Sequence, residues 1–252
     1  MRSRRARISV SPTVAGLSIT ALIMVGLIAF GPGENFHSLR RALGLAPSHS
    51  GHSVQFTPGE GTFKFLLTQR GSKQPVGYDP CEPIEYVVNP AGAPADWGQL
   101  VDTAVRDTEQ ASGLRFQYLG TTDKRPFDPN RGGLVGDVRS PAVVGFADAD
   151  EIPDLAGAVA GVGGSEAAAS ARGDLYYVTG SVALDTDVFD HASTGEDRDR
   201  LQAIVDHEFG HLVGLDHVPS DTELMSPVNV GQTWYGPGDL EGLARLGAIA
   251  CR

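Results

Sequence analysis

The feature that most constrains this chain is a group of histidines in its C-terminal third. His207 and His211 are four residues apart, so in a helix they lie one turn apart on one face and can bind one metal ion. Glu208, beside the first, can reach a water molecule in an open metal position. Gly214 can take the left-handed conformation that ends a helix, and the turn brings back His217 as a third ligand. Three protein ligands plus water predict a catalytic zinc site, because a structural site is closed by four.

The segments around this motif predict an α+β domain, with strands and one helix first and two helices after them. The predicted strands are Thr62–Leu67, Ile84–Val88, Leu114–Leu119, Ala142–Phe146, an exposed edge strand Leu155–Gly161, and a pair Leu175–Val178 and Ser181–Asp185 around Thr179-Gly180. The predicted helices are Asp96–Ala111 ending before Gly113, Glu196–Val213 capped by Thr194, and one capped by Asp239 that runs through Leu246. Residues 120–141 are rich in Gly, Pro and Asp, which predicts a long surface loop.

Beyond these patterns, the segment His207–His217 resembles the long zinc-binding signature of the metzincins, HExxHxxGxxH. Gly210 and the ending Gly214-Leu215-Asp216-His217 are similar to the matrixins in particular. Met225, eight residues after His217, resembles the Met-turn that runs beneath the metal in that family. Residues 238–243 look like the start of the matrixin C-terminal helix, and residues 80–86 and 111–116 resemble bacterial matrixin-like proteases. The likeness spans roughly residues 60–252.

The resemblance implies a zinc-dependent endopeptidase with a twisted, mainly parallel mixed sheet above a shallow cleft and a helical subdomain below. Glu208 would take the proton from the attacking water and pass it to the leaving amine, and Met225 would support the site without ligating the metal. A peptide substrate would pair with the edge strand, for which Leu155–Gly161 is the candidate. The wall of a side-chain pocket would include Pro227, Val228 and Asn229.

The chain also departs from the matrixin pattern. Val218 follows the third histidine, where matrixins often have a small polar residue, and no cysteine motif of a matrixin propeptide is visible. A second, structural zinc would need further histidines, and only His191 remains in the folded body, so we expect one zinc ion. Two acidic clusters could bind calcium or be solvated loops: Asp148, Asp150, Glu151 and Asp154 in one, and Asp185, Asp187 and Asp190 in the other.

The N-terminus predicts export. Residues 1–9 form an arginine-rich leader, and residues 10–30 are apolar and uncharged, just long enough to span a membrane. We expect an uncleaved signal anchor that holds the protein in the membrane with the body outside the cytoplasm. A cleaved signal peptide and secretion are the alternative. Residues 31–56 have the composition of a flexible tether, and residues 57–252 form the peptidase domain.

The two cysteines and the charge suit this location. Cys81 and Cys251 are an even number in an oxidising compartment, which predicts a disulfide. A free Cys81 that caps the metal is the alternative. The net charge of −11 argues against a nucleic-acid partner, and we expect a monomer.

Two rival functions are compatible with a zinc site. A zinc-stabilised binding module that cleaves nothing could use the same histidines, but such a site has no use for Glu208 as a base. A zinc hydrolase acting on something other than peptides is the second rival. The edge strand and the Met-turn favour peptides, through the family likeness alone.

Overall fold

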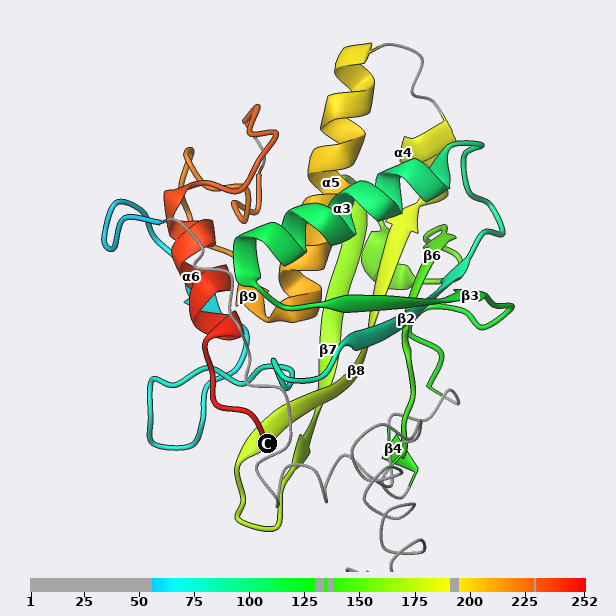
Figure 1. Cartoon of the computed structure of the whole chain (residues 1–252). Helices are drawn as coiled ribbons and strands as arrows, with labels where there is room; N and C mark the ends of the chain where they lie inside the picture. The colour runs from blue at the N-terminus through cyan, green and yellow to red at the C-terminus, as the bar shows by residue number, and fades with distance from the viewer. Residues whose placement is uncertain (1–55, 130–133, 136–137, 191–194, 229) are drawn as a thin grey trace, which may run out of the picture. The chain divides into compact units, whose positions relative to one another are not determined.

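Figure 1 shows the computed structural model of the chain, which describes residues 56–129, 134–135, 138–190, 195–228 and 230–252. The chain divides into two units, Met1–Ser50 and Gly51–Arg252, and every described residue belongs to the second. The predicted leader and signal anchor, and all but the last residue of the tether, lie outside the described residues. Among those residues, no helix has the length and apolar character needed to cross a bilayer.

A five-stranded sheet forms the framework of the domain (Figure 1). Its strands stand in the order β3 (Phe116–Thr121), β2 (Ile84–Asn89), β6 (Ala142–Ala147), β8 (Leu175–Asp185) and β7 (Gly161–Ala169). The first four run parallel to their neighbours, and β7 alone is antiparallel. All six residues of β6 are buried, as expected for a parallel strand covered on both faces. The mixed α+β architecture confirms the predicted fold class.

Two helices cover one face of this sheet and enclose the larger core. Helix α3 (Trp97–Ser112) and helix α5 (Gly195–Val213) bury their apolar residues against β2, β6 and β8. Helix α3 ends at Gly113, whose φ of 75° places it in the left-handed region, as the sequence predicts. The core between these elements includes Val88, Leu100, Phe146 and Phe209.

Helix α6 (Pro237–Gly247) packs in a second core, which includes Val213 and Met225. It starts two residues before the predicted cap, so Asp239 lies inside its first turn. The Asp239 carboxylate still accepts the Gly236 N–H at 3.0 Å. Thr194, the predicted cap of α5, lies outside the described residues.

The prediction of an edge strand at Leu155–Gly161 is wrong. Residues Pro153–Leu155 form a short 3₁₀ turn, η2, and the edge strand is β7, which begins at Gly161. Its sequence GVGGSEAAA has little β propensity. It becomes a strand because it pairs with β8 over nearly its whole length, from Gly161 opposite Leu184 to Ala169 opposite Leu175.

The predicted pair of strands around Thr179-Gly180 is also wrong, because β8 runs unbroken through both residues. Gly180 is needed for space rather than for a turn. A side chain there would collide with Leu212 of α5, which crosses the strand at this point. The reversal lies between Ser170 and Asp174, where Gly173 has a φ of 88°.

Smaller elements differ from the prediction mainly in length. Of the strand predicted at Thr62–Leu67, only β1 (Lys64–Phe65) forms, paired with β9 (Leu215–Asp216). The predicted loop 120–141 carries a two-residue hairpin, β4 (Leu134–Val135) with β5 (Val138–Arg139). A five-residue helix, α4 (Thr186–Asp190), follows β8.

The predicted disulfide is present between Cys81 and Cys251, with Cα atoms 5.6 Å apart. It joins residues separated by 170 positions, the start of the sheet and the segment after α6. On the chain-entropy model, closing so long a loop contributes about 5 kcal/mol to the free energy of unfolding.

Candidate metal centre

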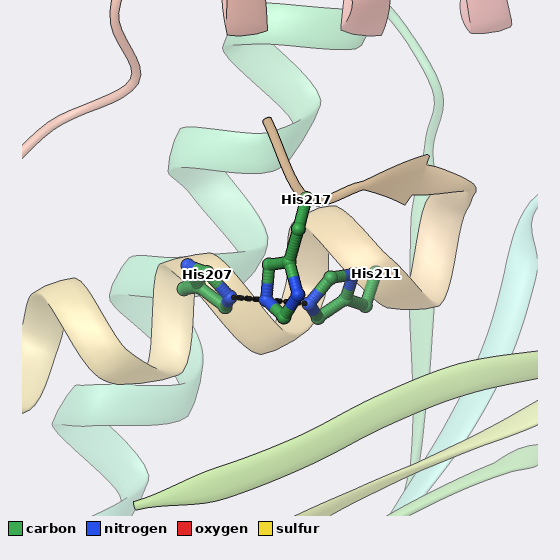
Figure 2. Close-up of side chains that lie close together, drawn as sticks. All are labelled: His207, His211 and His217. Atoms are coloured by element: carbon green, nitrogen blue, oxygen red, sulfur yellow. Dashed lines mark hydrogen bonds between the residues drawn. The ribbon is translucent and has the colours of Figure 1, made fainter. Parts of the chain in front are cut away.

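Three histidine side chains converge on one point beside helix α5 (Figure 2). His207 and His211 project from α5, and His217 follows β9. The Nε2 atom of His217 lies 2.9 Å from that of His207 and 3.0 Å from that of His211. In the described part of the chain, one other group of three or more His, Cys, Asp or Glu has its ligand atoms within 4.8 Å of one another: Asp79, Cys81 and Cys251, in which both sulfurs are in the disulfide.

The outer nitrogens of two of these rings fix which nitrogen faces the centre. His207 Nδ1 lies 2.7 Å from the Leu224 carbonyl oxygen, and His211 Nδ1 lies 2.8 Å from the Leu215 carbonyl oxygen. A carbonyl only accepts hydrogen bonds, so each Nδ1 carries the proton and each neutral ring turns an Nε2 lone pair inward. Lone pairs that face one another repel unless a cation lies between them.

The three imidazoles favour their neutral form. Burial, and then the neighbouring His211, lowers the pKa of His207 to about 3. Burial also lowers the pKa of His211 to about 4, and it lowers that of His217. Neutral imidazole is the form that binds metal ions, so the set is ready to bind a cation at neutral pH.

The arrangement fits zinc. Nitrogen ligands about 2.0–2.1 Å from a zinc ion at tetrahedral angles lie about 3.3–3.4 Å apart, a few tenths of an ångström more than the two Nε2 separations given above. His207, His211 and His217 would therefore hold the ion. They leave a fourth position for water or substrate, as in a catalytic site.

Gly214 ends α5 and directs the chain back towards the centre. Its φ of 124° is unfavourable for other residues, and its N–H bonds to the carbonyls of Gly210 and His211. The next two residues form β9, which is held by β1. This turn places His217 opposite the two helical histidines, as the sequence predicts.

Asp216 and Lys64 hold this returning segment. The carboxylate of Asp216 accepts the backbone N–H of His217 at 2.7 Å and pairs with the Lys64 ammonium at 2.6 Å. The sequence alone does not predict a role for Asp216 or for Lys64, because the pair forms only when β1 and β9 meet.

Glu208, the residue after His207 on α5, is buried, with 5% of its surface exposed. Its Oε2 atom has no hydrogen-bond partner. Burial raises the pKa of Glu208 to about 8, and a hydrogen bond from the Gly163 N–H opposes part of that shift. A carboxyl group with a pKa near neutrality can both take up and release a proton near pH 7.

The comparison with known proteins agrees with this geometry. The model of the family described as Matrixin matches residues 95–235. The chain belongs to the matrixin family. Matrixins are zinc metallopeptidases, so a zinc peptidase that acts on protein substrates is the activity class that membership indicates.

Other comparisons add less. No curated protein matches this matrixin in sequence. Two solved structures resemble it with TM-scores below 0.5. One is titled "GM1 bound form of the ECX AB5 holotoxin" and is 13% identical in sequence. The match covers 77% of this chain and 91% of that chain, with a TM-score of 0.44. The other, archaemetzincin from Methanopyrus kandleri, is 18% identical, covers 71% of this chain and 98% of its own, and gives 0.42.

The residues around Met225, predicted as the Met-turn, pack against α5. Met225 is 1% exposed, and a side chain at Gly210 would lie 2.5 Å from its sulfur, so glycine is required for this approach. The Met225 carbonyl accepts the Val218 N–H at 3.0 Å, which ties the turn to the residue after His217.

Two buried acids hold the predicted Met-turn in place: Asp239, which the sequence marked only as a helix cap, and Glu223, which it did not mark. Asp239 Oδ2 accepts the N–H groups of Leu224 at 2.5 Å and Gly236 at 3.0 Å. Glu223 Oε2 accepts those of Gly238 and Asp239 at 2.9 and 3.0 Å. Its Oε1 accepts that of Thr62 at 3.2 Å. These contacts join segments up to 161 residues apart, so local sequence patterns cannot reveal them.

The remaining predicted site residues have varied outcomes. Pro227 and Val228 follow the Met-turn and are exposed, and Asn229 lies outside the described residues. Cys81 cannot cap the metal as a free thiolate, because its sulfur is bonded to Cys251.

The predicted calcium clusters do not close around a common point in the described residues. Glu151 instead pairs with Arg125 at 2.5 Å, and Asp148 and Asp185 accept nearby backbone N–H groups. Calcium binding therefore stays a prediction. His191, weighed for a second zinc, lies outside the described residues.

Proposed function

We propose that this matrixin is a zinc-dependent endopeptidase that hydrolyses peptide bonds of proteins outside the cytoplasm, with Glu208 as its general base. One observation carries the proposal. Three neutral imidazoles turn Nε2 atoms to one point, and the residue after the first of them, Glu208, is a buried acid with an unpartnered oxygen. A structural metal site would need a fourth protein ligand and no base.

The reaction divides between the metal and the chain. When bound, a zinc ion supplies Lewis acidity, which makes a nearby water molecule easier to deprotonate and polarises the scissile carbonyl. Glu208 takes the proton from the attacking water and delivers it to the leaving amine. Because no side chain here acts as a nucleophile, we expect no covalent acyl-enzyme.

The substrate is proposed to lie along β7. Within the described sheet this strand stands at the edge, with β8 on one side and no strand on the other. An extended peptide could bond to backbone groups along its outer edge by strand addition. Pro227, Val228 and Asn229, after the Met-turn, are proposed as part of the wall of a side-chain pocket.

The proposed location rests on the N-terminal sequence and the cysteines. The arginines before residues 10–30 predict a signal anchor, with secretion after cleavage as the alternative. The disulfide between Cys81 and Cys251 supports an oxidising compartment. We propose a membrane-held monomer whose peptidase domain faces outward.

The proposal is tested by measuring bound zinc and casein cleavage in the same samples of full-length protein, as wild type and as Glu208→Ala. We expect about one zinc per chain in both and cleavage by the wild type only. Zinc in both without cleavage by either would favour a binding module. A well-folded wild type without zinc would overturn the proposal.

A further inference from the structure

We infer that Gly161 and Gly163 of β7 form a side-chain-free seat that positions Glu208, so that both act as positioning residues. This inference rests on the proposed function, because Glu208 is the base of that reaction. The two glycines lie at alternate positions of the strand and so face the same side of the sheet.

That side faces helix α5. The next residue of the same parity, Ser165, donates a hydrogen bond from its hydroxyl to the Leu212 carbonyl of α5 at 2.6 Å. Its oxygen also lies 2.5 Å from the Tyr78 hydroxyl. Gly161, Gly163 and Ser165 thus follow α5 in order, the glycines against Glu208 and the serine against Leu212.

The two glycines meet different parts of Glu208. A methyl group at Gly161 would lie 2.7 Å from Cγ, 3.0 Å from Cδ and 3.0 Å from Oε1, all in the side chain. A methyl group at Gly163 would overlap the Glu208 carbonyl oxygen and lie 3.1 Å from its Cα, both in the helix backbone. Gly161 therefore leaves room for the carboxyl group, and Gly163 leaves room for the helix.

Gly163 also contributes its N–H, which bonds to the Glu208 carboxyl group. A carboxyl group that accepts a hydrogen bond from β7 and packs against the backbone of the same strand has little freedom to change its position. Catalysis is sensitive to such placement, because a shift of about 1 Å in a reacting group can cost on the order of 100-fold in rate.

The strand also provides a matched control. A methyl group at Gly164 would find nothing within 4 Å, although Gly164 belongs to the same strand and pairs with Ser181 of β8. Gly164→Ala therefore makes the same chemical change to the same strand without touching Glu208.

The test uses full-length protein carrying Gly161→Ala, Gly163→Ala or Gly164→Ala, each in the wild-type and Glu208→Ala backgrounds. Bound zinc, kcat and KM for a peptide, and the melting temperature are measured for each. We expect Gly161→Ala to keep its zinc and its KM but to lose about 10- to 100-fold in kcat. Gly164→Ala should match the wild type in bound zinc and melting temperature.

The melting temperatures test the contact independently of activity. Gly161→Ala should lower the melting temperature in the wild type but not in Glu208→Ala, where the opposing side-chain atoms are gone. Gly163→Ala should lower it in both backgrounds, because it opposes backbone atoms that remain.

An unchanged kcat in Gly161→Ala, or an equal loss of melting temperature in both backgrounds, would overturn the inference. If the wild type cleaves nothing, the proposed function fails. The melting temperatures then still decide whether the glycines seat Glu208.

Discussion

Two buried glutamates, Glu208 and Glu223, show how this domain uses the same side chain for opposite purposes. Both are almost fully buried, at 5% and 0% exposure. Each carboxylate oxygen of Glu223 accepts at least one backbone N–H, from Thr62, Gly238 and Asp239. Glu208 instead keeps its Oε2 without a partner.

The difference lies in what replaces water around the carboxylate. Three backbone N–H donors replace the water that Glu223 loses on burial. Its carboxylate therefore connects the segment around Thr62, the predicted Met-turn and α6. Glu208 has too few donors, and burial therefore raises its pKa to about 8. A compensated buried acid stabilises the fold, whereas an uncompensated one is ready for proton transfer.

The largest expected effect comes from Glu208→Gln. The amide keeps the shape but cannot take a proton from water, so we expect kcat to fall by about 10²–10⁴-fold with zinc content unchanged. The melting temperature of the zinc-free variant should not fall, since a neutral group replaces one whose charge is unfavourable there. Peptide cleavage and calorimetry test this, with the exposed Glu60→Gln as control. Cleavage at the wild-type rate would remove the distinction between the two glutamates.

Removing zinc tests whether His207, His211 and His217 form a metal site. A ligand that binds only the folded state stabilises it, by about 4 kcal/mol when free zinc exceeds the dissociation constant 1,000-fold. A chelator should therefore lower the melting temperature of the wild type and of Glu208→Gln alike. It should leave His211→Ala nearly unchanged. An equal response from His211→Ala would argue against the site.

The same substitution at the other acid should act on stability instead. In Glu223→Gln an amide NH₂ replaces one carboxylate oxygen and cannot accept a hydrogen bond from the backbone N–H groups that face it. We therefore expect a loss of about 3 kcal/mol in the free energy of unfolding. Denaturant titration measures this loss. The kcat of the folded, zinc-loaded variant should stay within a few-fold of wild type. A variant as stable as wild type but inactive would reverse the assignment of the two residues.

The smallest effect concerns Asp239, whose Oδ1 lacks a partner. Burial, and also the nearby Glu223 charge, raises its pKa to about 7, above the unfolded value of about 3.9. The folded state then keeps a proton that the unfolded state has lost, so stability falls as the pH rises from about 4 to about 7.

Asp239→Asn cannot ionise and should escape this loss. Relative to wild type, its free energy of unfolding should improve by about 2.6 kcal/mol between pH 5 and pH 8. Denaturant titrations at both pH values, with the exposed Asp150→Asn as control, measure the difference. A difference that does not change with pH would mean that Asp239 is compensated like Glu223.

The parts of the site that could be predicted from the sequence are local. Helical spacing puts His207 and His211 on one face, and a glycine stop returns His217, so one short segment determines their geometry. The family likeness and the disulfide were likewise predicted and are confirmed.

The parts that could not be predicted depend on distant contacts. Strand β7 has a glycine-rich sequence and takes its form from β8, so the edge strand was misplaced. Gly180 looked like a turn because the nearness of Leu212 is invisible in the sequence. Glu223 and Lys64 receive their roles from segments more than 150 residues away.

The most direct test of the central claim is X-ray absorption at the zinc edge on full-length protein purified with its metal. We predict one zinc ion with three imidazole nitrogens and one oxygen ligand at about 2.0–2.1 Å. In His217→Ala the imidazole contribution should fall by one. A sulfur ligand, a fourth protein nitrogen or no zinc at all in folded protein would contradict the account.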